Sequence, residues 1–225
     1  DYMMSAIARM LNERLSELAQ SANPPFNMAG CSPDADFFLS GTKKSFDITA
    51  YTKDDGLSNG LKVLLQEVER VRRHGFTESE YARARANILQ QLESQYNERE
   101  KTNNMAYVNQ CLQHFLHAEP MPGIEYEYAT LNQLAPNIPV QAINQVAQQL
   151  ITNNNQAVFI AAPDKEGVVI PTKEEVIADL KAMPTLQVEA YVDKVSNEPL
   201  IKEAPKGGKI VSQKDNALFG ATELT

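Results

Sequence analysis

One long stretch decides the fold class: residues 56 to 128 read GLSNGLKVLLQEVERVRRHGFTESEYARARANILQQLESQYNEREKTNNMAYVNQCLQHFLHAEPMPGIEYEY. Apolar side chains recur along it at intervals of three and four residues, as on one face of a helix. We expect a first helix to end at Gly75, a residue that tolerates the left-handed conformation found after many helices. Thr77 and Glu80 have the spacing of a capping box, which predicts a second helix from residue 78. This stretch is therefore expected to be predominantly helical.

The second helical pattern continues to residue 118, and we expect a break near residues 101–104, where polar residues interrupt the stripe. Pro120 and Pro122 end it, because proline lacks an N–H and clashes with the preceding turn. Further helices are predicted at residues 2–19, 124–134 and from 139 to 150. A second capping box, Thr172 to Glu175, predicts another from 172 to 180.

Strands are predicted on both sides of the long helical stretch. Phe26–Cys31 and Ser45–Thr52 carry strand-type residues, and the second alternates apolar with polar side chains. Residues 32–36 and 41–44 between them are rich in turn formers. The apolar run Ala157–Ala161 predicts a third strand. The chain is therefore expected to contain both helices and strands.

Composition excludes several classes of protein. The chain has 225 residues, a net charge of −8 and no apolar run near the ~20 residues that span a bilayer. Basic residues cluster only at Arg70, Arg72, Arg73 and His74, where they complement a helix dipole, so no nucleic-acid surface is expected.

Cys31 and Cys111 are expected to be free and mostly buried thiols, and a disulfide between them stays open as an alternative. The chain enters a helical pattern directly after Asp1, with no initiator Met, and we interpret it as a segment of a longer polypeptide.

His114 and His117 are the candidates for metal ligands, in the sequence HFLHAE. Two imidazoles at positions i and i+3 can share a helix face. Zinc peptidases of the zincin type instead place two histidines at i and i+4 with a glutamate between them, and Glu119 falls beyond the second histidine, next to Pro120. We therefore expect these histidines to pack or cap the helix end. No catalytic, cofactor-binding or metal-binding residue is assigned.

An ordered set of motifs resembles the pitrilysin/insulinase family of zinc metallopeptidases, specifically the second, non-catalytic domain of a long bacterial member. The set begins with residues 11–18 (LNERLSEL) and continues with Gly56-Leu57 and Gly75-Phe76-Thr77. It ends with Tyr96, Glu100, Lys101 and the sequence from Phe115 to Tyr128. The family's zinc motif, a helical HxxEH, is absent from the chain.

The resemblance implies an α+β fold. Its form in the family is a two-layer sandwich, a mostly antiparallel sheet with helices on one face, here lacking its first edge strand. It assigns residues 1–192 to a non-catalytic domain and residues 193–225 to an extended linker or strap toward the next domain. It further implies that the full-length protein is a metalloendopeptidase with zinc in its N-terminal domain, and that this domain forms part of the wall of a peptide-binding chamber. The expected partners are the other domains of the polypeptide and the peptide substrate. Family analogy favours the periplasm or cell envelope.

Two alternatives stay open at this stage. An inactive family member acting as a structural or assembly subunit would share all these motifs, because the deciding HxxEH lies outside the chain. An independent enzyme on this fold would need a convergent set of nucleophile, acid and base, which the sequence does not display.

Overall fold

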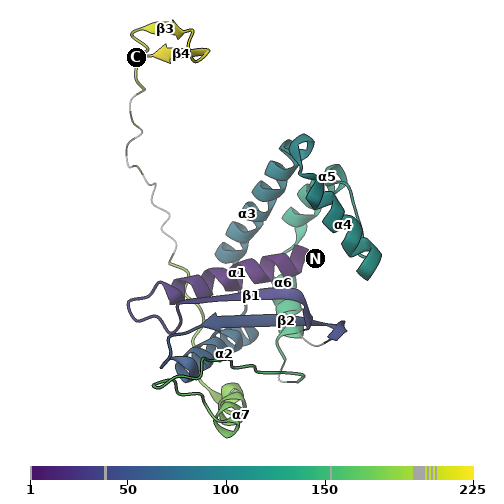
Figure 1. Ribbon diagram of the computed structural model, residues 1–225, viewed down its shortest axis with the longest axis vertical. Helices are drawn as coiled ribbons and strands as arrows, with labels where there is room; N and C mark the ends of the chain where they lie inside the picture. Colours follow the sequence, from purple (N-terminus) through teal and green to yellow (C-terminus); the bar gives the residue numbers. More distant parts are fainter. Residues whose placement is uncertain are drawn as a thin grey trace. The chain divides into compact units, whose positions relative to one another are not determined.

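The computed structural model of the protein describes residues 2–37, 40–152, 154–194, 201, 203, 205 and 207–225 (Figure 1). These residues form two compact units, Asp1–Asp193 and Lys194–Thr225. The larger unit combines helices with a two-stranded antiparallel sheet, so the fold is α+β, as predicted.

Helix α1 (Tyr2–Ala19) lies against a hairpin of β1 (Met28–Phe37) and β2 (Ser40–Tyr51), as Figure 1 shows. The register pairs Met28 with Tyr51 and Cys31 with Ile48. The prediction that residues 32–36 and 41–44 form turns was wrong, because both strands continue through them. The strand pairing is irregular between Ser32 and Ala35. Such bulges accommodate turn-forming residues and proline inside a strand.

Helices α2 (Leu57–His74) and α3 (Glu78–Asn97) form as predicted, and Gly75 separates them. Gly75 has φ 69°, and an added Cβ would lie 2.5 Å from the Asn144 side chain, so this position requires glycine. The Thr77 capping box is present, with the Thr77 hydroxyl accepting from the Glu80 amide and the Glu80 carboxylate accepting from the Thr77 amide.

The break in the long helical stretch was predicted correctly. A 3-10 turn (Arg99–Lys101) separates α3 from α4 (Asn104–His117), and α5 (Ile124–Leu134) follows the two prolines. Tyr96 of α3 stacks on Tyr128 of α5 with ring centroids 4.4 Å apart. This contact joins α5 to α3, whereas every residue from 101 to 121 is exposed.

The remaining predicted helices are present as α6 (Val140–Leu150) and α7 (Lys173–Ala182), with short 3-10 turns at Ala135–Asn137 and Met183–Thr185. The prediction of a third strand was wrong, because residues 157–161 do not form one in the structure. Their apolar composition fits the strand pattern, but a short apolar run alone does not determine that a segment joins a sheet.

The hydrophobic core joins one face of α1 to the start of α3 and the inner face of α6. Helix α1 contributes Ile7, Met10, Leu11 and Leu15, all fully buried. The other fully or nearly fully buried members are Ala6, Phe26, Val71, Phe76, Tyr81, Ala84, Ile143 and Ala147. The helix-facing side of the hairpin packs against this core through Ala29, Cys31, Phe46, Ile48 and Ala50.

The smaller unit, Lys194–Thr225, contains a hairpin that the sequence did not predict. Strands β3 (Gln213–Asn216) and β4 (Ala221–Leu224) pair in antiparallel register, and Gly220 adopts φ 58° in the connecting turn. The roles predicted for the two parts of the chain, a non-catalytic domain and a linker, remain predictions.

Candidate functional site

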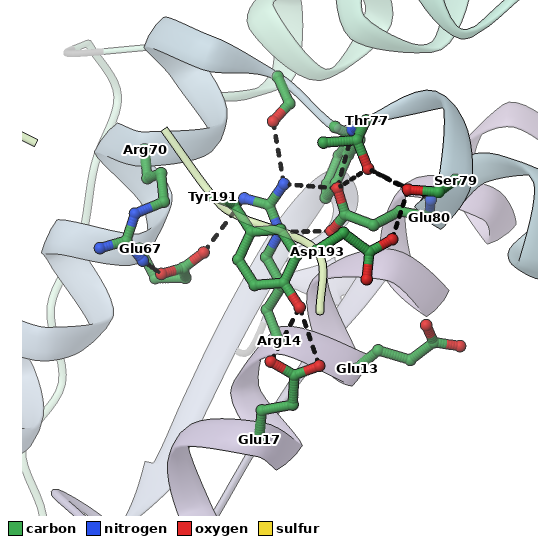
Figure 2. A network of polar contacts seen from close by, with 12 residues as sticks. Glu13, Arg14, Glu17, Glu67, Arg70, Thr77, Ser79, Glu80, Tyr191 and Asp193 are labelled. Atoms are coloured by element: carbon green, nitrogen blue, oxygen red, sulfur yellow. Dashed lines mark hydrogen bonds and ion pairs between the residues drawn. The ribbon is translucent and has the colours of Figure 1, made fainter. Parts of the chain in front are cut away.

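The most elaborate polar site is built around Arg14, which is only 2% exposed although it lies on the apolar face of α1 (Figure 2). Its guanidinium donates to Glu80 at 2.6 and 2.9 Å and to Glu67 at 3.2 Å. It also donates to the carbonyl of Gly75 at 3.0 Å. Arg14 thus ties α1 to the end of α2 and the start of α3. We call Arg14, Glu67 and Glu80 the buried charge cluster.

A second arginine, Arg70, balances the excess negative charge of the buried charge cluster. Arg70 pairs with the second oxygen of Glu67, and Thr77 donates to Glu80 from its amide and its hydroxyl. Burial by itself lowers the pKa of Arg14, but the hydrogen bonds and charges of the two carboxylates outweigh it, so the pKa is raised. The guanidinium is therefore held permanently charged, with its donors satisfied by the protein itself. This describes a structural cluster.

A crossing segment, residues 186–193, runs over the buried charge cluster. Tyr191 lies with its ring 4.2 Å from the Arg14 guanidinium carbon and donates its hydroxyl to Glu17 at 2.8 Å. Asp193 accepts from Arg83 at 2.7 Å and from Ser79. The Arg83 hydrogen bond holds the pKa of the Asp193 carboxyl below its usual range. Figure 2 shows Tyr191 and Asp193 reaching the cluster from the same extended segment of the chain.

The end of α2 holds the same crossing segment by its backbone. Arg70 donates to the carbonyl of Glu189 at 3.0 Å, and His74 Nε2 lies 2.7 Å from the carbonyl of Val188, which is buried. Arg73 donates to the carbonyl of Pro184 just upstream. The basic group at the end of α2, expected only to complement the helix dipole, therefore also anchors the last part of the larger unit.

The two histidines of α4 lie in the last turn of the helix, where both are exposed. His114 Nδ1 is 2.7 Å from the carbonyl of Glu119, an exposed helix-end contact. Both imidazoles are exposed, and among the described residues no three His, Cys, Asp or Glu side chains gather as metal ligands. A structural or catalytic zinc ion needs at least three protein ligands, so this set does not fit zinc.

The cysteines differ from one another. Cys31 faces α1 from strand β1, and burial raises the pKa of its thiol to about 12. Cys111 is exposed on α4, so the expectation of two mostly buried thiols was wrong for this residue. Both are free.

The face of the hairpin turned away from the core is the best candidate for binding. It forms a shallow depression of about 290 Å³ whose lining includes Met28, Ser32, Asp47, Thr49 and Tyr51. Met28 and Tyr51 are 59% and 60% exposed at one end of the hairpin, where their backbones pair. The surface is mainly apolar, with one carboxylate (Asp47) and three hydroxyls (Ser32, Thr49 and Tyr51). It can hold an extended chain, and it presents no pair of groups for acid–base or nucleophilic chemistry.

At the edge of the hairpin formed by β1, the side chain of Asn12 from α1 bonds to the backbone of Cys31. Its amide accepts from the Cys31 N–H at 2.7 Å and donates to the Cys31 carbonyl at 3.2 Å. A neighbouring strand would bond the backbone in the same way. Asn12 belongs to the LNERLSEL motif noted in the sequence, and this contact explains why a polar residue stands beside buried Leu11.

Comparison with known proteins finds similarity to zinc proteases. A protein of Arabidopsis thaliana described as zinc protease PQQL-like is 28% identical over 222 residues, which are 98% of this chain and 20% of the relative. The crystal structure of the periplasmic protease PqqL from Escherichia coli matches 99% of this chain and 24% of its own, with TM-score 0.67 and 20% identity. The first half of PqqL, solved separately, matches 85% of this chain and 41% of its own, with TM-score 0.63 and 18% identity. No protein-family model matches the chain.

These comparisons confirm the resemblance to pitrilysin-type zinc metallopeptidases that the motifs predicted. The chain spans about a fifth of the length of the curated relative and about a quarter of the solved PqqL chain. The described residues contain no helix long and apolar enough to cross a membrane.

Proposed function

We propose that this chain is the second, non-catalytic domain of a zinc-dependent endopeptidase of the PqqL type. The observation that carries the proposal is similarity over 98% of the chain to a zinc protease of which it covers only 20%. The resemblance to the family implies that the catalytic metal is held by another domain, toward the N-terminus, and among the described residues no three His, Cys, Asp or Glu side chains gather as metal ligands. That zinc ion would activate a water molecule for attack on a peptide carbonyl.

The contribution of this domain is a wall of the chamber that receives the peptide. The outer face of the β1–β2 hairpin supplies that wall, since it is open, mainly apolar and lacks catalytic groups. A wider antiparallel sheet with helices on one face, the two-layer sandwich of the family, would continue this surface. The periplasm is the compartment proposed for the parent protein, because PqqL of Escherichia coli is periplasmic.

Cleavage of an unstructured peptide by the full-length parent and by this chain, measured side by side, tests the proposal. The parent is expected to cleave, and this chain alone is expected to be inactive. In the parent, Thr49→Trp fills the depression and should raise KM more than it lowers kcat, because it blocks binding and leaves the distant chemistry intact. The matched control is Thr185→Trp, at an exposed position outside the depression. Cleavage by this chain alone would contradict the assignment, and an inactive parent would favour the assembly-subunit alternative.

A further inference from the structure

Helix α4 (Asn104–His117) is a feature of the larger unit that the packing of the described residues does not explain. None of its residues is buried, and its sequence, NMAYVNQCLQHFLH, contains no Asp, Glu, Lys or Arg. Exposed helices of globular proteins normally carry charged residues on the solvent side. A 14-residue helix is also marginal by itself in water, because short helices depend on packing for most of their stability.

The apolar side chains of α4 gather on one side. At 3.6 residues per turn, Met105, Val108, Leu112, Phe115 and Leu116 fall on one face, with Cys111 at its border. Phe115 is 83% exposed and Met105 is 62% exposed. The opposite face carries polar residues, among them Gln110 and His117. We call the first set the α4 apolar face.

The chemistry of this face selects the kind of partner. A helix without Lys or Arg has no electrostatic attraction to an anionic lipid surface or to nucleic acid. Large exposed apolar patches on folded proteins mark contacts with other protein surfaces. The partner is therefore an apolar, uncharged protein surface.

We infer that the α4 apolar face packs against a neighbouring domain of the same polypeptide. The chain covers 41% of the solved first half of PqqL and 24% of the whole, so most of a PqqL-type protein lies outside it. A covalently linked domain is present at high effective concentration, which favours it over a second copy. This inference shares one element with the proposed function: the chain is part of a longer parent protein. It does not depend on that parent being an active protease.

Cys111 provides a probe at the border of the face. Its thiol is exposed here, so a pulse of iodoacetamide should modify it readily in this chain. In the full-length parent, mass spectrometry of the peptide containing Cys111 should show modification at least about tenfold slower, because the covered thiol reacts only through opening of the interface. The matched control is Gln110→Cys in a Cys111→Ser background. This thiol lies on the opposite face of the same helix and should react at similar rates in chain and parent.

A charge placed in the interface tests the same inference through stability. Leu112→Glu should lower the melting temperature of the parent, whereas Gln110→Glu should leave it unchanged. Equal effects of the two variants, or a Cys111 that reacts as fast in the parent as in this chain, would overturn the inference. Protection that develops only in a parent dimer, detected by sedimentation, would overturn it in favour of a second copy. A parent that protects Cys111 but neither binds zinc nor cleaves peptides would refute the proposed function and leave this inference standing.

Discussion

Removing the charge of Arg14 is the strongest single perturbation of the larger unit that the structure predicts. Arg14, Glu67 and Glu80 are each 2% exposed, so Arg14→Met leaves two buried carboxylates without their shared partner. Breaking a buried ion pair on one side costs about 3–5 kcal/mol, since the remaining carboxylates stay buried and lose their main partner. For a unit of this size that loss lowers the melting temperature by roughly 10 °C.

Far-UV circular dichroism during urea unfolding measures this effect, and it suits a chain that contains no tryptophan. The control is Lys165→Met, which removes an exposed ion pair with Asp54 and should cost at most about 1 kcal/mol. Combining Arg14→Met with Glu67→Gln and Glu80→Gln should recover much of the stability, because no uncompensated charge is left buried. A loss below about 1 kcal/mol for Arg14→Met would refute the description of this cluster as buried and mutually dependent.

Three further predictions concern single sites. Gly75→Ala should lower the free energy of unfolding, measured in urea, by about 1–3 kcal/mol. The substitution strains the backbone at φ 69° and places a Cβ against the Asn144 side chain. An unchanged unfolding midpoint would contradict this requirement for glycine. The pKa of Asp193 is lowered by Arg83, so its contribution is complete above the unfolded-state pKa of about 4 and is lost as the pH falls through the lower folded-state value. Asp193→Asn should therefore weaken the decrease in the free energy of unfolding below about pH 4, measured by urea unfolding at several pH values. An unchanged pH dependence would show that Asp193 does not contribute. Cys31 should resist alkylation in the folded chain at pH 8, because its thiol is buried and has a pKa of about 12, and rapid labelling would contradict that burial.

Local signals in the sequence determined most helices correctly. Capping boxes at Thr77 and Thr172, and prolines after His117, marked helix ends that depend only on neighbouring residues. Strand limits were less predictable, because the bulge at Ser32–Ala35 and the lack of a strand at residues 157–161 depend on backbone partners elsewhere in the chain.

The buried charge cluster could not be predicted from the sequence, because its members are far apart along the chain. Arg14 has the appearance of an ordinary surface residue in a helix, and its partners lie 53 and 66 positions away. Tyr191 reaches Glu17 across 174 positions. The motifs at residues 11–18 and 75–80 did mark this region, and the structure shows that their shared purpose is to hold three helices together.

The measurement that tests the central claim most directly is the zinc content of the purified full-length parent and of this chain, determined by mass spectrometry of the metal after dialysis. We expect about one zinc ion per parent molecule and none in this chain, with the same result for His114→Ala and His117→Ala variants. Stoichiometric zinc in this chain that is lost in those variants would contradict the assignment of a non-catalytic domain.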